Sequence, residues 1–386
     1  KKVPYSLFKG IAPGWDNTAR KPNNSSIYQG SSPSVYKEWL LDLINWTYEV
    51  HPKSYRFIFI NAWNEWAEGA HLEPDRKYGY GNLQSTADAI LESRIREKSL
   101  KKTDSIFVKK FGRLSDKEWY EMLKLSVQNP VVDGIKLPGF PDSTLQTQFV
   151  GSANENALGE AYLFYTLLKQ YSITLGIPLN HQSKVLDFDV GWGRILRFFL
   201  KDIEEYNLFG VDVDPDIIEI CKNTGMPGVY RVVPPIGPTD FEDNSFDLIY
   251  AYSVFSHLSE RIHLEWIKEV SRILKPGGIF IATTEARHFI DFCTSLTEET
   301  IKSDWHKALS TAFPNPTKAL EAYERGEFIF VPTGGGGIRD VSFYGEAVIS
   351  KLYVERHWTK YFNLCDFIDD KNRFWQAVIV MQKPKV

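Results

Sequence analysis

The sequence has few cysteines, no long apolar run and no excess of charge of one sign, and each absence excludes a class of protein. Its three cysteines stand far apart in 386 residues, at Cys221, Cys293 and Cys365. That spacing is typical of neither a metal site nor a disulfide framework, and so sparse a count fits a reducing cytoplasm. No apolar stretch approaches the ~20 residues of a membrane-spanning helix. We therefore expect no transmembrane segment and no metal.

The charge balance argues against a nucleic-acid partner. Lys and Arg number 45 against 49 Asp and Glu, which leaves a net charge of −4, whereas binding to a phosphate backbone favours a basic surface. The hydrophobic fraction of 43% and the charged fraction of 24% are ordinary for a globular chain. Aromatic residues reach 14%; such rings can stack on sugar faces or simply fill a core.

Two stretches divide the chain. Residues 93–105 are charged and lose their apolar periodicity, and residues 129–144 carry three prolines and two glycines, which exclude a continuous helix. We therefore expect a first unit at 1–98, a connector at 99–145 and a second unit at 146–386.

The first unit alternates strands and helices. Apolar runs at 5–11 and 57–60 predict strands, and helical spacing at 36–50 and 83–95 predicts the helices that follow them. This order predicts two units of a parallel α/β architecture. About 100 residues is far short of the ~250 that a complete eight-stranded α/β barrel requires.

The second unit is predicted to be a doubly wound α/β domain that ends in an antiparallel hairpin. A long helix at 156–175 precedes strands expected at 184–188, 208–213, 229–233, 246–251 and 278–284, with helices at 193–204, 215–223 and 260–274. Such alternation indicates a parallel, Rossmann-like sheet. The last two strands, 361–367 and 374–381, are joined by the turn residues 369–372, which signal a hairpin.

A glycine-containing turn follows the first strand of this sheet. Residues 185–194 read VLDFDVGWGR, and glycines at such a turn let the backbone approach a ligand. About twenty residues later the next strand ends at Asp212. An acidic side chain at that position can accept two hydrogen bonds from a ribose diol.

Together with the terminal hairpin, these segments resemble the class I S-adenosylmethionine-dependent methyltransferases. Three further segments strengthen the resemblance, namely 244–250 (NSFDLIY), 274–278 (LKPGG) and 376–380 (QAVIV). The resemblance covers about residues 146–386. It implies S-adenosylmethionine as cofactor, with the ribose on Asp212 and the adenine near Val213. The remaining cofactor-binding residues that it implies are Asp187, Phe188, Asp189, Gly191, Gly193 and Ser253.

Asp189 departs from the pattern of the family, which has glycine at this position. Its side chain adds bulk beside the cofactor, and its charge opposes the cofactor's own carboxylate. Aspartate tolerates unusual backbone angles better than most residues. We therefore expect weakened rather than abolished cofactor binding.

The acceptor side of the predicted site is less defined. His257 follows the fourth strand and is a candidate base, although a structural role is the alternative. Glu285, Arg287 and His288 follow the fifth strand, where an acceptor would approach. Residues 288–345 form an insertion that contains Gly334–Gly337, which we interpret as a mobile cap.

A pair of carboxylates follows the second strand of the first unit. Residues 60–74 read INAWNEWAEGAHLEP, so that Glu65 and Glu68 stand three apart beside Trp63 and Trp66. Paired carboxylates act as acid and base on glycosidic bonds, although a chance acidic loop is the alternative. With residues 13–18 (PGWDNT), this string resembles the WbsX-type glycosyltransferases, which are related to the endo-mannosidases of glycoside hydrolase family 99.

The resemblance assigns roles to both carboxylates. Glu65 matches the residue that assists attack by the sugar's own 2-hydroxyl, and Glu68 matches the acid/base. It covers about residues 1–98, the last quarter to third of that domain, without the earlier barrel strands. We therefore expect the chain to be a fragment, and we expect no glycosyl transfer or hydrolysis from this segment alone.

The sequence thus predicts an S-adenosylmethionine-dependent methyltransferase fused to a truncated glycosyltransferase-like segment. The expected acceptor is a carbohydrate or lipid-linked sugar of surface polysaccharide (O-antigen or capsule) biosynthesis. The expected location is the cytoplasm, including the surface of the inner membrane. Two alternatives stay open, a non-catalytic cofactor-binding or scaffold module, and a parent protein that is chiefly a glycosyltransferase or endo-glycosidase.

Overall fold

The structure, a computed structural model, describes residues 6–21, 23–335 and 338–385. The chain divides into two compact units, Lys1–Trp119 and Tyr120–Val386. Much of the stretch that we expected to be a connector, 99–145, has regular structure. It contains α3 (Ile106–Phe111), α4 (Asp116–Gln128), the hairpin of β5 (Val131–Val132) and β6 (Ile135–Lys136), and the start of α5 (Ser143–Val150).

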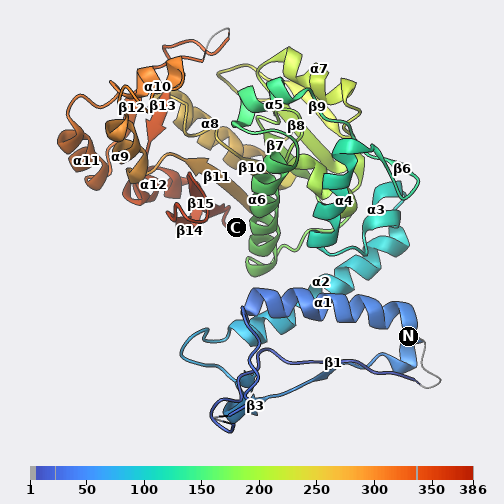
Figure 1. Ribbon diagram of the computed structural model, residues 1–386. Helices are drawn as coiled ribbons and strands as arrows, with labels where there is room; N and C mark the ends of the chain where they lie inside the picture. Colours follow the sequence, from blue (N-terminus) through green and yellow to red (C-terminus); the bar gives the residue numbers. More distant parts are fainter. Residues whose placement is uncertain (1–5, 22, 336–337, 386) are drawn as a thin grey trace. The chain divides into compact units, whose positions relative to one another are not determined.

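The first unit is built around one strand–helix–strand element. The strands β1 (Gly10–Ile11) and β2 (Phe59–Ile60) pair in parallel, with Gly10 opposite Phe59. Between them runs α1 (Pro33–Val50), which the Ser32 side chain caps by accepting from the Val35 amide. Both strands are shorter than predicted. The other elements are β3 (Asn64–Glu65), β4 (Ala70–His71) and α2 (Gly81–Lys102), and α2 lies beside α1 (Figure 1).

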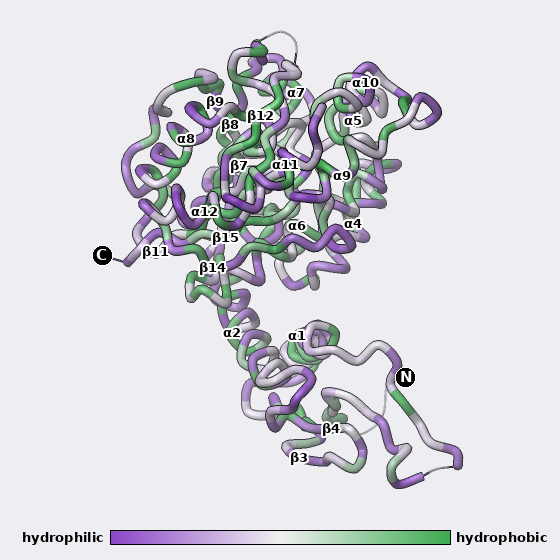
Figure 2. The backbone as a smooth tube through the Cα atoms, turned by 90° about the vertical axis from the view of Figure 1, so that its left-hand side faces the viewer, coloured by the Kyte–Doolittle hydropathy of each residue, from purple (hydrophilic) through white to green (hydrophobic). Residues whose placement is uncertain are grey.

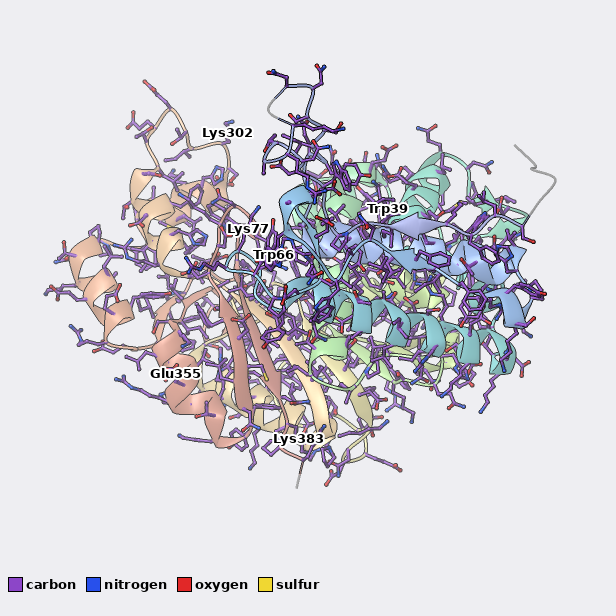
Figure 3. The ribbon with its side chains drawn as sticks, turned by 90° about the horizontal axis from the view of Figure 1, so that it is seen from below. Trp39, Trp66, Lys77, Lys302, Glu355 and Lys383 are labelled. Atoms are coloured by element: carbon purple, nitrogen blue, oxygen red, sulfur yellow. The ribbon has the colours of Figure 1, made fainter. Side chains whose placement is uncertain are left out.

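The apolar core of this unit lies between α1, α2 and the two short strands. Its buried members are Ile11, Tyr36, Leu40, Leu41, Leu43 and Ala89. Several aromatic side chains stay outside it, at Phe57, Phe59, Trp63, Trp66 and Tyr80, each at least half exposed. Figure 3 labels Trp66, which begins the short 3₁₀ segment Trp66–Glu68 directly after β3. In the described residues the β1–β2 pair has no further strand on either edge. The unit therefore presents open strand edges next to exposed aromatic rings.

We expect residues 1–119, expressed alone, to aggregate, because open strand edges and clustered apolar surface promote intermolecular pairing. Replacing Phe57 and Phe59 by Lys should raise the soluble fraction, since both side chains are more than half exposed. Sedimentation and thermal melting would test this. A wild-type fragment that is monomeric and melts cooperatively would contradict the expectation.

The second unit contains a seven-stranded sheet in its described residues, with the order β14-β15-β11-β10-β7-β8-β9. β15 runs antiparallel to both of its neighbours, β11 and β14, and the other strands run in one common direction. The strands are β7 (Val185–Phe188), β8 (Leu208–Asp212), β9 (Val229–Val232), β10 (Phe246–Ala251), β11 (Leu274–Thr284), β14 (Asn363–Ile368) and β15 (Ala377–Gln382). The predicted α/β fold with a terminal antiparallel hairpin is confirmed.

Helices cover both faces of this sheet (Figure 1). They are α6 (Asn154–Thr174), α7 (Pro215–Asn223), α8 (Glu260–Ile273) and α12 (Lys351–His357), with short 3₁₀ segments at Leu196–Lys201, Glu205–Asn207 and Trp358–Lys360. The strands are predominantly apolar, as the green stretches of Figure 2 show. The central strands β7 and β10 are almost wholly buried, as expected for parallel strands covered on both faces. The switch in strand order between β7 and β10 creates a crevice at the carboxyl ends of the strands.

An insertion follows β11 and returns to the sheet through β13. It comprises α9 (Arg287–Ser295), α10 (Asp304–Leu309), α11 (Pro316–Glu324), β12 (Ile329–Val331) and β13 (Glu346–Val348). Backbone hydrogen bonds from the Gly345 amide to His257 and from the Ala347 amide to Ser256 attach it to the loop between β10 and α8. Of the predicted flexible run Gly334–Gly337, Gly336 and Gly337 lie outside the described residues.

Candidate active site

The turn after β7 is fixed to the end of β8. The amides of Asp189 and Val190 both donate to the carbonyl of Val211, at 2.9 Å each. Asp189 has φ +76°, and Gly191 has φ +52°. A Cβ atom on Gly191 would meet nothing within 4 Å, so the backbone there faces open space. The chain thus presents bare main chain to a ligand beside the carboxyl end of β8.

The same attachment brings Asp189 against Asp212. The two carboxyl groups lie close enough that each changes the pKa of the other, and two such groups do not both ionise without cost. Burial and the adjacent charge of Asp189 raise the pKa of Asp212 to about 8, against a bond from the Asp214 amide. Desolvation raises the pKa of Asp189, although the positive charge of Arg339 opposes this. We expected the negative charge of Asp189 to repel the carboxylate of the cofactor. In the structure the Asp189 side chain lies against Asp212, the residue predicted to hold the ribose.

Asp187 forms the inner wall of this turn. Its side chain is 3% exposed, and its Oδ2 accepts a 2.8 Å hydrogen bond from the hydroxyl of Tyr250 on β10. Burial raises the pKa of Asp187 well above its usual range, and the bond from Tyr250 offsets part of the rise. Three carboxyl groups, at 187, 189 and 212, therefore stand at the head of β7 and β8.

A cavity of about 840 Å³ opens at this edge of the sheet. Its walls include five of the predicted cofactor residues and the candidate base, namely Asp187, Asp189, Gly191, Asp212, Ser253 and His257. Beside it lies a smaller apolar slot, whose walls include Phe188, Val213, Trp266 and Phe343. Gly193 lines neither space; a Cβ on it would come within 2.9 Å of Met226, so it serves close packing behind the turn.

His257 stands at the insertion side of the cavity. Its Nδ1 bonds the carbonyl of Gly345 at 2.9 Å and lies 3.4 Å from Glu346, while the Tyr344 ring stacks on it. Desolvation lowers the pKa of His257, but the bonds to Glu346 and to the Gly345 carbonyl outweigh it and leave a net rise. The imidazole therefore retains a proton more firmly than a free histidine.

Glu285 and Gln376 form a second polar group in the cavity. Glu285, which follows β11, is 4% exposed, and its Oε1 accepts a 2.9 Å bond from the amide nitrogen of Gln376. The sequence analysis named Gln376 only as part of the motif of the last strand, and it predicted no role for this residue in the site. Arg339 and Trp305, both from the insertion, also line the cavity. No sequence signal indicated either, because they approach the sheet from a segment without a recognisable pattern.

The predicted glycosyl carboxylates lie in the first unit. One guanidinium, that of Arg20, contacts both, at 3.2 Å from Glu65 and 3.0 Å from Glu68. Trp66 stacks on His71 and donates its indole N–H to Glu73 at 2.7 Å. The spacing predicted in the sequence therefore does bring Glu65 and Glu68 to one cation. A substrate that used both groups would have to displace Arg20.

Two further features of the chain concern membranes and metals. Among the described residues, no helix combines the length and the apolar character needed to cross a membrane. Within the same part of the chain, no cluster of three or more His, Cys, Asp or Glu side chains is arranged to hold a metal ion.

Two solved structures resemble this chain at low overall similarity. The PH0226 protein of Pyrococcus horikoshii is 20% identical with a TM-score of 0.40, covering 60% of this chain and 92% of its own. An S-adenosylmethionine-dependent methyltransferase of Clostridium acetobutylicum is 12% identical with a TM-score of 0.39, covering 58% and 92%.

Curated relatives match one half of the chain or the other. WxcX of Xanthomonas campestris is 45% identical over 86 residues, which are 22% of this chain and 12% of WxcX. The fatty-acid O-methyltransferase of Mycolicibacterium smegmatis is 27% identical over 151 residues, 38% of this chain and 50% of the relative. A phthiotriol/phenolphthiotriol dimycocerosates methyltransferase of Mycobacterium ulcerans is 28% identical over 131 residues, 34% and 46%. The chain thus spans half or less of each of these relatives.

Two family models match separate segments. The model described as "Glycosyltransferase WbsX" matches residues 1–86, and the one described as "Methyltransferase domain" matches residues 185–278. Both predicted resemblances are confirmed, and the second match runs from the first residue of β7 into β11, across the turn and the Asp212 strand end. The chain therefore carries a methyltransferase domain, preceded by a segment of the WbsX glycosyltransferase family.

Proposed function

We propose that the second unit binds S-adenosylmethionine and transfers its methyl group to a hydroxyl of a carbohydrate. The observation that carries this proposal is the turn after β7, which places bare main chain and the Asp212 carboxyl at one end of a methyltransferase sheet. The carbohydrate class is supported by the WbsX segment on the same chain, which suggests surface polysaccharide biosynthesis, with a free or lipid-linked sugar as acceptor.

The residues fit this cofactor in three respects. The main chain at Gly191 faces open space, which suits close approach of the methionine part. The Asp212 carboxyl can accept hydrogen bonds from a ribose diol, and the apolar slot beside Val213 suits an adenine ring. The carboxyl of Asp189, when ionised, suits the positive charge of the cofactor. The remaining proposed contacts, from Phe188, Gly193 and Ser253, follow from the resemblance.

The bound cofactor would supply an electrophilic methyl group on a sulfonium. The chain's own task is then to orient the acceptor hydroxyl, to exclude water and to accept a proton. His257 is the base that the sequence proposes. The Nδ1 of His257 bonds the Gly345 carbonyl and lies near Glu346, and these contacts favour the protonated imidazole. A protonated His257 would place positive charge on the insertion side of the cavity.

Two alternatives have specific support. The Asp189 side chain lies against Asp212, the proposed ribose acceptor, which favours a non-catalytic module if a ligand cannot displace it. The second alternative concerns the first unit, where Glu65 and Glu68 lie together on Arg20. There we propose the remnant of a glycosyl site whose activity depends on the whole parent protein.

Replacing Asp212 by Ala should weaken binding of S-adenosylhomocysteine by about 1–3 kcal/mol, because the ribose hydroxyls lose their charged acceptor. Isothermal titration calorimetry on the full chain measures this. Asp240→Ala is the matched control, since that carboxyl is exposed and pairs with Arg231 outside the cavity. Equal affinities for the wild type and Asp212→Ala would remove the assignment.

The affinity of the wild type for S-adenosylhomocysteine should rise with pH up to about 8. Asp212 has its pKa raised to about 8, so that below this pH it holds a proton which the ribose hydrogen bonds must displace. Burial is the larger cause of this raised pKa, but Asp189→Gly removes the adjacent charge that adds to it, so this variant should bind more tightly at pH 6 with a flatter pH profile. Asp189→Asn should recover part of the gain. Parallel profiles in all three proteins would show that Asp189 does not control the site.

The same pair predicts a pH dependence of stability. A folded-state pKa above the unfolded value means that Asp212 favours folding fully below about pH 4, and that this contribution is lost as the pH rises through about 8. Asp189→Gly should therefore stabilise the protein more at pH 8.5 than at pH 5, on top of about 1 kcal/mol from relieving the left-handed backbone. Thermal melts at the two pH values would show this, and an equal gain at both would contradict it.

A further inference from the structure

We propose that Glu285 is the general base for the acceptor hydroxyl, and that the indole rings of Trp375 and Trp305 hold the sugar that carries this hydroxyl. The inference rests on the proposed methyl transfer and adds an acceptor site to it. All three side chains line the cavity that contains the Asp189–Asp212 pair. The acceptor would therefore enter opposite the cofactor side, between β11 and the insertion.

The position of Glu285 suits a base. The residue directly follows β11, at the carboxyl edge where β7 and β10 also end. Its side chain is 4% exposed, and Oε2 is buried without a hydrogen-bond partner in the described part of the chain. A buried carboxylate oxygen that lacks a protein partner is costly unless a ligand group satisfies it. An acceptor hydroxyl would supply that group.

Gln376 fixes the orientation of this carboxyl. Its carbonyl oxygen accepts from the Thr283 hydroxyl at 2.5 Å, so the amide nitrogen must point the other way. That nitrogen donates to Glu285 Oε1 at 2.9 Å and lies 3.0 Å from Ser253 Oγ. Because the amide can hold only one oxygen of the carboxyl, it leaves Oε2 available. Gln376 is accordingly a positioning residue.

The surrounding charges keep Glu285 ready to exchange a proton near neutrality. Burial raises the pKa of Glu285 to about 7, while the bond from Gln376 and the positive charge of His257 lower it and Glu346 raises it. Tyr252 and Cys293 also face it, and burial raises the pKa of each, so both stay neutral. Half of the Glu285 carboxyls are therefore ionised near pH 7, which is the condition for an efficient base.

His257 is less suited to this task. Its Nδ1 is committed to the Gly345 carbonyl, and the contacts with Glu346 and Gly345 raise the pKa of His257, which favours the protonated ring. A protonated imidazole has no free lone pair with which to accept another proton. Its charge instead lies close enough to Glu285 to favour the carboxylate. His257 then supports the base rather than replacing it.

Two exposed indoles form the platform. Trp375 is 44% exposed and is held by edge contacts to His288 and Phe292, with ring centroids 5.0 and 5.3 Å away. Trp305 is 47% exposed and donates its N–H to Glu346 at 2.8 Å. Fixed aromatic rings beside carboxyl and amide groups suit a sugar, whose C–H face is apolar and whose hydroxyls need polar partners. A lipid chain would leave these polar groups unsatisfied.

The proposed methyl transfer needs no reactant other than the cofactor and the acceptor hydroxyl. The acceptor oxygen forms a bond to the methyl carbon, and the carbon–sulfur bond breaks with its electron pair left on sulfur as a neutral thioether. The hydroxyl proton passes to Glu285 Oε2, and is released to solvent when the product leaves.

The test uses the full chain with two kinds of probe acceptor, the methyl α-glycosides of mannose, rhamnose and galactose, and decanoic acid as the lipid. Tryptophan fluorescence reports glycoside binding, calorimetry reports S-adenosylhomocysteine binding, and labelled S-adenosylmethionine reports transfer. We expect the wild type to bind and methylate a glycoside, with a rate that rises with pH to a plateau above about 7. Trp375→Ala should weaken glycoside binding about tenfold, and Trp375→Phe should keep most of it.

Glu285→Gln should bind both ligands as the wild type does, lose the rise of rate with pH and transfer at least about 100-fold more slowly. Glu285→Asp should retain the pH profile at a lower rate, which separates loss of the base from misfolding. Glu299→Gln, an exposed glutamate of the insertion, should behave as the wild type. Unchanged transfer by Glu285→Gln, or methylation of decanoic acid alone, would overturn the inference while the cofactor site stands. A wild type that binds no S-adenosylhomocysteine would overturn the proposed function and this inference with it.

Discussion

The closeness of the Asp189 and Asp212 carboxyl groups is the constraint on which the proposed chemistry of the second unit depends. The two side chains come together because the amides of residues 189 and 190 both donate to the carbonyl of Val211, the neighbour of Asp212 at the end of β8. Two adjacent carboxyls cannot both ionise without cost. If a ribose binds Asp212 as we propose, its binding is therefore linked to the loss of a proton from this pair.

The rest of the cavity follows from the order of the strands. Because β7 lies between β8 and β10, and β11 lies beyond β10, one edge of the sheet carries two chemically different halves. The half at β7 and β8 has carboxyls and open main chain. The half at β11 and β15 has Glu285, oriented by Gln376, and is walled by the indoles of the insertion. A methyl donor on one side and a nucleophile on the other would meet between them, near Ser253 and His257.

The features of the fold and the site that could be predicted from the sequence are those set by residues close together in the chain. The sheet, its hairpin and the position of Asp212 follow from local apolar periodicity and turn residues, and these expectations were confirmed at the level of fold. The pairing of Asp189 with Asp212 could not be read, because it depends on how a left-handed residue aims its side chain. Gln376 and Glu285 stand 91 residues apart, and Arg339, Trp305 and Glu346 come from an insertion without repeated pattern. Arg20 likewise reaches Glu65 and Glu68 through a loop that carries no motif.

The number of protons released when S-adenosylhomocysteine binds is the most direct measure of the central claim. Calorimetric titrations at pH 7 in buffers of different ionisation enthalpy give this number for the wild type and for Asp189→Gly. If the carboxyl pair holds a proton that the ribose displaces, the wild type should release close to one proton, and the variant should release fewer, because it loses the adjacent charge of Asp189 but keeps the burial of Asp212. Tight binding by the wild type without proton release would contradict the account.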